Sequence, residues 1–113
     1  MEQLPSFLEK KQRIFEAYRR SFEGLEEARI FVPPPESQSN HWLNSLILAP
    51  GSERELHTIL EHAHQNRILL RPAWKPLHSL EMYRDAPRMN LEGTEKIARS
   101  LISLPSSAGL LDA

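Results

Sequence analysis

Apolar residues recur at three- and four-residue steps near the start of the chain, between residues 4 and 29. The stripe comprises Leu4, Phe7, Leu8, Phe15, Tyr18, Phe22 and Leu25. This spacing is typical of one face of an α-helix, and Pro5 is tolerated in a first turn, so we predict a long helix that begins near Leu4. Such a helix presents more apolar surface than the remaining chain easily covers. We therefore expect part of it to pack against another surface.

Shorter segments of regular structure are predicted after a proline-rich connector at residues 33–35. Apolar runs of strand length and helical periodicities alternate through the rest of the chain. The predicted strands are residues 42–48, 68–70 and 101–104, and the predicted helices are residues 53–66 and 91–100. Residues 72–90 contain three prolines and several aromatic or polar side chains, which predicts a structured loop.

This order of elements predicts an α/β (α+β) fold, a small three-stranded sheet with helices packed on one face. A length of 113 residues is typical of one domain. Within it we expect residues 1–30 to be a long linking helix and residues 31–113 to form the small α/β domain.

Composition removes several classes of function. The formal net charge is −1, so no electrostatic argument favours nucleic acid or an anionic membrane surface as a partner. Cysteine is absent, which excludes disulfides, thiolate catalysis and thiolate metal sites. No apolar stretch reaches the length of a membrane span, and the first residues lack the pattern of a signal peptide. We expect a cytoplasmic protein.

The loop from Arg71 to Tyr83 contains the most informative side chains. Arg71 could bind a carboxylate or phosphate through two parallel hydrogen bonds, and Trp74 and Tyr83 could pack against a base or sugar ring. His78 could donate a hydrogen bond or move a proton. A structural alternative remains open, in which Trp74 and Met82 cover a small core and Arg71 pairs with a surface acid.

Other polar residues give weaker signals. Asn40 and Asn44 lie where the chain leads into the first predicted strand, and a turn or strand-edge role is favoured there over a ligand contact. Metal ligands on a helix favour spacings of three or four residues, which His57, His62 and His64 do not have. No carboxylate or cysteine completes a ligand set with them, so we expect no metal site. Of the four lysines, Lys75 lies in the loop, but we expect none to be a catalytic nucleophile.

Four stretches of this sequence together resemble a known family. They are Leu4-Pro-Ser-Phe-Leu-Glu-Lys-Lys-Gln-Arg-Ile-Phe-Glu-Ala-Tyr18, Asn40-His-Trp-Leu-Asn44, residues 66–83 with the run Arg71-Pro-Ala-Trp-Lys-Pro-Leu-His78, and Leu104-Pro-Ser-Ser107. The chain resembles the C-terminal domain of the DegT/DnrJ/EryC1/StrS aminotransferases. It looks most similar to the branch that acts on UDP-linked amino sugars for legionaminic-acid-like or lipopolysaccharide sugars.

The resemblance implies a fold-type-I parent enzyme that uses pyridoxal phosphate (PLP) to aminate a 4-keto nucleotide sugar. The family's Schiff-base lysine and other cofactor-binding groups would lie upstream of residue 1, so this chain would bind no cofactor and be inactive alone. The implied substrate-binding residues are Arg71, Trp74, His78, Tyr83, Asn40 and Trp42.

Two further hypotheses compete with an enzyme fragment. The chain could be a complete, non-catalytic binding or protein-interaction module whose first helix is a docking face, or a structural fragment that binds no ligand. Apolar area exposed on the first helix would promote self-association. We therefore expect a homo-oligomer formed through that helix.

Overall fold

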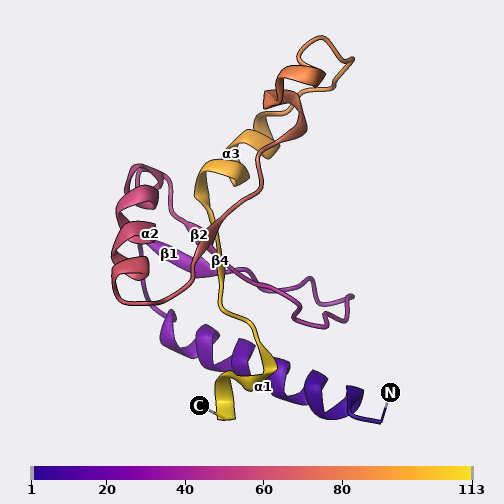
Figure 1. Ribbon diagram of the computed structural model, residues 1–113, viewed down its shortest axis with the longest axis vertical. Helices are drawn as coiled ribbons and strands as arrows, with labels where there is room; N and C mark the ends of the chain where they lie inside the picture. The colour runs from indigo at the N-terminus through magenta and orange to yellow at the C-terminus, as the bar shows by residue number, and fades with distance from the viewer. Residues whose placement is uncertain (1, 113) are drawn as a thin grey trace.

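A computed structural model describes residues 2–112 of the chain (Figure 1). The helices are α1 (Leu4–Ser21), α2 (Leu56–Gln65) and α3 (Glu92–Ser100), and the strands are β1 (Ala28–Ile30), β2 (Asn44–Leu48), β3 (Arg71–Pro72) and β4 (Leu101–Leu104). Short 3-10 helices are η1 (Glu53–Glu55), η2 (Leu77–Ser79), η3 (Glu81–Tyr83) and η4 (Ala108–Asp112). The predictions for α2, α3, β2 and β4 are thereby confirmed to within a few residues.

The strands form one antiparallel sheet in the order β1-β2-β4-β3. Leu46 of β2 lies between Ile30 of β1 and Ile102 of β4, so these side chains share one face of the sheet. The predicted α/β (α+β) fold is confirmed, but the sheet has four strands and not the three that were predicted.

The additional strand comes from the segment that was predicted to be the end of the first helix. That helix was expected to reach residue 29, but α1 ends at Ser21. Gly24 has a φ of +80°, a conformation that suits glycine and turns the chain into β1. Ala28 and Ile30 of β1 are buried, and Arg29 between them is exposed. An alternation this short is easily hidden within a helical stripe, which explains the wrong prediction.

The second strand was also misplaced. Residues 68–70 were predicted to be a strand, but the pairing with β4 begins at Arg71. The backbone N–H groups of Arg67 and Ile68 donate to the carbonyl oxygens of His64 and Ala63, so these residues close the end of α2. Leu69 is consequently 70% exposed. Because residues 67–68 complete the end of α2, β3 begins three residues later than predicted.

Both α1 and α2 pack on the same face of the sheet, as predicted. Phe15 of α1 and Leu56 and Leu60 of α2 join alternate strand residues in the core. Those strand residues are Ala28, Ile30, Leu46, Leu48, Ile102 and Leu104. Ile102 lies at the centre and has no exposed surface.

α3 runs directly into β4 and extends away from α1, as Figure 1 shows. Beside it, residues 74–89 form a projecting segment that contains η2 and η3; we call this segment the arm. Much of the arm's apolar surface is open to solvent, because Leu77, Met82 and Met89 are all more than half exposed. Across residues 2–112, none of the helices combines the length and apolarity that a bilayer crossing requires.

Candidate functional site

The six predicted substrate-binding residues fall into two separate regions of the fold. Asn40 and Trp42 lie beside α1 and η4, where they line a hollow together with Phe7 and Lys11. The other four belong to the edge strand β3 and to the arm.

His78 and Tyr83 are brought together in the arm. They line a hollow of about 400 Å³ between the arm and the start of α3. Its other lining residues are Pro76, Leu77, Ala86, Pro87, Arg88, Leu91 and Thr94. We call this the arm hollow. Because it combines an apolar lining with a few polar groups, it has the general character of a small-molecule site.

Trp74 and Arg71 do not line the arm hollow. Trp74 is 86% exposed and Met82 is 76% exposed, so the structural alternative in which they cover a small core is wrong. Arg71 is exposed on β3, opposite Ser103 of β4. Within residues 2–112 its guanidinium forms no ion pair with a surface acid. Both side chains are therefore available to a ligand or another protein surface.

The imidazole of His78 is held by a residue that sequence reasoning missed. Its Nε2 lies 3.1 Å from Oε1 of Glu95 in the first turn of α3. Arg88 also approaches His78, because its guanidinium donates a long hydrogen bond of 3.5 Å to the backbone oxygen. A cation and an acid therefore accompany His78 at the arm hollow. The side-chain oxygen of Asn90 accepts a hydrogen bond from the backbone N–H of Glu92 at 2.9 Å. An asparagine directly before a predicted helix was therefore the sequence signal that Glu95 would lie in the first turn of α3.

Asn40 and Trp42 are placed by local structure and not by a ligand-like arrangement. The side-chain oxygen of Asn40 accepts a hydrogen bond from the backbone N–H of Trp42 at 3.0 Å, which is the turn role that the sequence favoured. Trp42 is 67% exposed. The residue between them, His41, is buried, and its backbone has a positive φ of 47°.

Beneath this turn lies a group of polar side chains, Lys11, His41, Asn44 and Ser106, which we call the polar cluster. Nζ of Lys11 donates to the backbone oxygens of Ser106 at 2.6 Å, Trp42 at 3.2 Å and His41 at 3.4 Å. The ring of His41 stacks on Phe15 with 4.3 Å between centroids. Burial is the main reason that the pKa of His41 is lowered from its usual value.

Asn44 and Ser106 complete the polar cluster. Oγ of Ser106 accepts hydrogen bonds from the backbone N–H and the side-chain amide of Asn44, at 2.9 and 3.0 Å, and donates to the oxygen of Leu104. Both residues are buried. These contacts tie α1, the start of β2 and the end of β4 together, so the hydrogen bonds of the polar cluster serve the fold.

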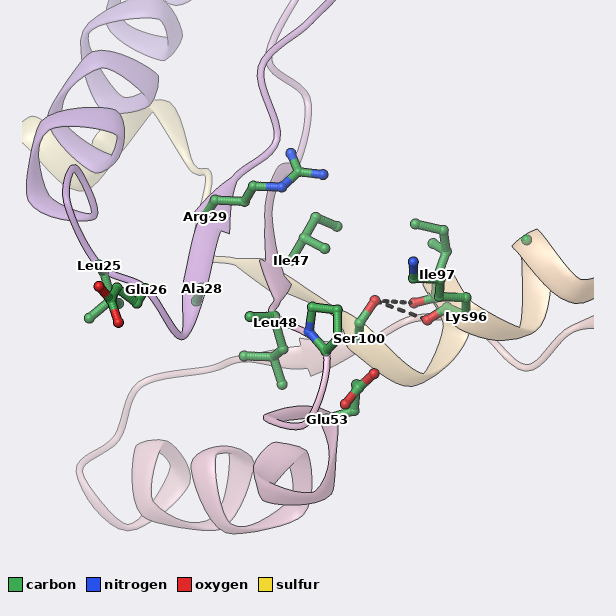
Figure 2. Close-up of a pocket in the computed structure, with 13 residues that line it drawn as sticks. Leu25, Glu26, Ala28, Arg29, Ile47, Leu48, Glu53, Lys96, Ile97 and Ser100 are labelled. Carbon is green, nitrogen blue, oxygen red and sulfur yellow. Dashed lines mark hydrogen bonds between the residues drawn. The ribbon is translucent and has the colours of Figure 1, made fainter.

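A third open hollow is lined by residues of β1, β2 and α3 (Figure 2). Ile47 of β2 and Ile97 of α3 provide apolar lining, and Arg29, Lys96 and Glu53 also line it. Oε2 of Glu53 accepts a hydrogen bond from the N–H of Gly51. Hydrogen bonds from its own N–H and that of Gly51 lower the pKa of the Glu53 carboxyl, with smaller contributions from Arg99 and Lys96.

None of the four lysines has the desolvated surroundings that a Schiff-base lysine requires. Lys10 forms an ion pair with Asp112 at 2.7 Å, and Lys11 donates to three backbone oxygens in the polar cluster. Lys75 and Lys96 are exposed. None of the lysines therefore fits the role of a covalent anchor for PLP.

The three histidines on α2 are exposed and do not gather. Nε2 of His64 lies 3.0 Å from the backbone oxygen of Leu70, so this ring contacts the segment that connects α2 to β3. In the described part of the chain, no three residues of the His, Cys, Asp or Glu types are arranged to hold a metal ion.

Comparison with known proteins relates the whole chain to one family. A model of the DegT/DnrJ/EryC1/StrS aminotransferase family matches residues 1–113. EpsN of Bacillus subtilis (strain 168), named as a pyridoxal phosphate-dependent aminotransferase, is 28% identical over 116 residues. That match covers 99% of this chain but 29% of EpsN.

Solved structures show the same fold. PseC of Helicobacter pylori, an aminotransferase involved in the biosynthesis of pseudoaminic acid, superposes with a TM-score of 0.86 at 22% identity, covering 96% of this chain and 30% of PseC. DesI, solved in the presence of its TDP-sugar product, superposes with a TM-score of 0.84 at 23% identity, covering 96% of this chain and 28% of DesI. The chain therefore spans less than a third of the length of these relatives.

Proposed function

The chain belongs to the DegT/DnrJ/EryC1/StrS aminotransferase family, and from this premise we propose that it is the C-terminal domain of a PLP-dependent sugar aminotransferase. The parent would transfer an amino group to a 4-keto nucleotide sugar, in the biosynthesis of lipopolysaccharide or sialic-acid-like sugars. PLP would provide the electron sink of that reaction. In a cytoplasmic parent, this chain would provide part of the substrate side of the site.

One observation carries the proposal: a match over 99% of this chain covers 29% of the relative. The lysines support it, because each is either exposed or committed to neighbouring oxygens and acids. We therefore propose that the covalent anchor of the cofactor belongs to another part of the parent and that this chain alone is inactive. In this scheme α1 links the large domain of the parent to the small domain. The small domain begins between Ser21 and Ala28, because β1 belongs to its sheet.

The arm and the exposed strand β3 are the proposed substrate wall. His78 and Tyr83 line the arm hollow, where a sugar or base could lie against the Tyr83 ring. Arg71 and Trp74 present an exposed guanidinium and an exposed indole, which suit a phosphate and a ring. Asn40 and Trp42 would approach the substrate from the α1 side.

The inactivity of the chain can be tested chemically. We expect incubation with PLP, followed by borohydride reduction, to leave the intact mass of the chain without a stoichiometric adduct. A variant with Lys75→Arg should give the same spectrum, because exposed lysines react only weakly. A one-to-one adduct that is lost in Lys75→Arg would overturn the proposal.

The substrate wall can be tested in the full-length aminotransferase. We expect His78→Ala to raise the KM for the nucleotide sugar about tenfold, which corresponds to the loss of about 1.4 kcal/mol for one hydrogen bond to a ligand. His57→Ala is the matched control, because His57 is exposed on α2, away from the arm. Equal kinetics for both variants would remove His78 from the site.

A non-catalytic interaction module is the second candidate, and the exposed apolar face of α1 favours it. Leu4, Phe7 and Leu8 are 51%, 45% and 41% exposed. We propose that this face joins two copies of the chain. Sedimentation should show a dimer that Phe7→Glu dissociates and that Arg13→Glu, at an exposed position of the same helix, preserves. A strictly monomeric chain at high concentration would contradict it.

A further inference from the structure

The arm is joined to α3 by a specific side-chain contact. Among the described residues, the hydrogen bond between His78 and Glu95 is the only one between side chains of the arm and of α3, and it spans 17 positions of sequence. The His78 side chain is 19% exposed and that of Glu95 is 50% exposed. The histidine is thus the less exposed partner, and the carboxylate of Glu95 remains half exposed.

This contact determines which nitrogen of the ring carries a proton. A carboxylate only accepts hydrogen bonds, so Nε2 must be protonated when it lies 3.1 Å from Oε1 of Glu95. In the neutral ring, the other nitrogen then has a free lone pair and accepts a hydrogen bond. Within residues 2–112 no protein group forms a hydrogen bond with Nδ1.

The lone pair on Nδ1 of His78 determines which ligand groups can bind there. A lone pair repels the oxygens of a phosphate but accepts a hydrogen bond from a hydroxyl. Nucleotide sugars carry hydroxyl groups on both the hexose and the ribose. The guanidinium of Arg88, which lines the same hollow, is the group there that suits the phosphates.

We propose that Glu95 is a positioning residue for substrate binding: it holds the proton on Nε2 of His78, so that Nδ1 accepts a hydrogen bond from a hydroxyl group of the nucleotide sugar. This inference rests on the proposed function, because it assumes that His78 belongs to the substrate site. Glu95 itself does not touch the substrate. It acts by fixing the orientation and the tautomer of the ring.

The tautomer can be measured in the chain itself, without substrate. Two-bond ¹H–¹⁵N correlation spectra of labelled histidine identify the protonated nitrogen at about pH 8, where an ordinary histidine ring is neutral. We expect His78 to be protonated on Nε2 in the wild-type chain. In Glu95→Gln the amide can present either its oxygen or its N–H to Nε2, so the preference for the Nε2-protonated form should weaken and the Nδ1-protonated population should rise.

Glu92→Gln is the matched control. Glu92 and Glu95 are the acidic residues in the first turn of α3, so either variant removes one charge from the same end of the helix. Glu92→Gln should leave the His78 spectrum unchanged. An Nδ1-protonated wild-type ring, or the same spectrum in both variants, would overturn the inference.

Kinetics in the full-length aminotransferase separate this inference from the proposed function. Glu95→Gln should raise the KM for the nucleotide sugar about three- to tenfold, as expected for one misdirected hydrogen bond, and leave the KM for the amino donor unchanged. Glu95→Asp should recover part of the loss, because it restores a carboxylate acceptor.

The two hypotheses fail in different ways. If His78→Ala leaves the KM for the nucleotide sugar unchanged, the assignment of His78 to the substrate site fails, and this inference fails with it. If His78→Ala raises that KM but Glu95→Gln matches Glu92→Gln, the substrate site stands and only the role of Glu95 is wrong.

Discussion

The polar cluster beneath α1 and the arm beside α3 contain similar residue types but place them in opposite environments. In the polar cluster, Lys11 donates to three backbone oxygens, and Asn44 and Ser106 are buried and bonded to each other. In the arm, Trp74 is 86% exposed, and one side-chain hydrogen bond among residues 2–112, between His78 and Glu95, connects the arm to α3.

The difference indicates which polar groups are available for function. A buried polar group must be hydrogen-bonded within the protein, because leaving it unpaired costs about 1–3 kcal/mol. The ammonium of Lys11, the hydroxyl of Ser106 and the N–H groups of Asn44 are therefore committed to the fold, whereas the buried Oδ1 of Asn44 has no hydrogen-bond partner among the described residues. Those of the arm remain open to a ligand or partner, and little stability depends on them.

The largest expected effect on the free energy of unfolding comes from a substitution at the centre of the core, and the comparison is a substitution in the arm. Ile102→Ala should lower the free energy of unfolding by about 2–5 kcal/mol, because Ile102 is fully buried and its truncation leaves a cavity. Trp74→Ala should change it by less than about 0.5 kcal/mol. Urea denaturation measures both. A large loss in Trp74→Ala would show that the arm packs more tightly than its exposure indicates.

A smaller effect is expected within the polar cluster. Ser106→Ala removes the oxygen that accepts both hydrogen bonds of Asn44, so unfolding should become easier by about 1–3 kcal/mol. Ser107→Ala is the control, because Ser107 is exposed and accepts one long hydrogen bond from Gly109. Equal denaturation midpoints for the two variants would mean that the cluster contributes no net stability.

The third prediction concerns pH and should be smaller again. Because burial lowers the pKa of His41, the unfolded chain binds a proton at higher pH than the folded chain does. Stability is therefore full above the ordinary histidine pKa, about 6.5, and decreases as the pH falls from there through the folded-state pKa.

Denaturation curves at neutral and mildly acidic pH test this sign. We expect His41→Asn, which tolerates the positive φ of residue 41, to weaken the pH dependence of stability. His57→Gln should preserve it, because His57 is exposed. A wild-type chain that becomes more stable on acidification over this range would refute the assignment to His41.

The smallest effect is expected for the contact that holds the arm. Glu95→Gln should change the free energy of unfolding by less than about 1 kcal/mol, because partly exposed ion pairs contribute little. Hydrogen exchange in the arm should increase while exchange in β2 and β4 stays the same. A global loss of stability would place Glu95 among the structural groups and weaken the comparison.

Local patterns predicted most of the secondary structure. The periodicity of α2 and the apolar run of β4 are long enough, or sharply enough bounded, to be recognised without tertiary information. β1 and β3 are three and two residues long and gain their stability from pairing with β2 and β4, so no local signal could identify them.

The candidate site was predicted only in part. The sequence indicated the loop from Arg71 to Tyr83 for its aromatic and polar side chains, and Trp74 and Tyr83 are exposed in the structure, but a substrate-binding role stays a prediction. Its division was not predictable, because Arg71 lies on a strand while His78 and Tyr83 line a hollow with Arg88 and Thr94. Asn40 and Trp42 line a different hollow, beside α1.

The sequence by itself determined the family, the mixed helix and sheet composition, and the absence of any thiol chemistry, since these depend on residue types and on spacings along the chain. The tertiary structure decided which polar residues are committed to the fold and which remain open. His41 and His78 look alike in a sequence, but one stacks on Phe15 in the interior and the other meets Glu95 at the edge of an open hollow. Burial and hydrogen-bond partners come from residues distant in the chain, so only the folded arrangement can distinguish the two.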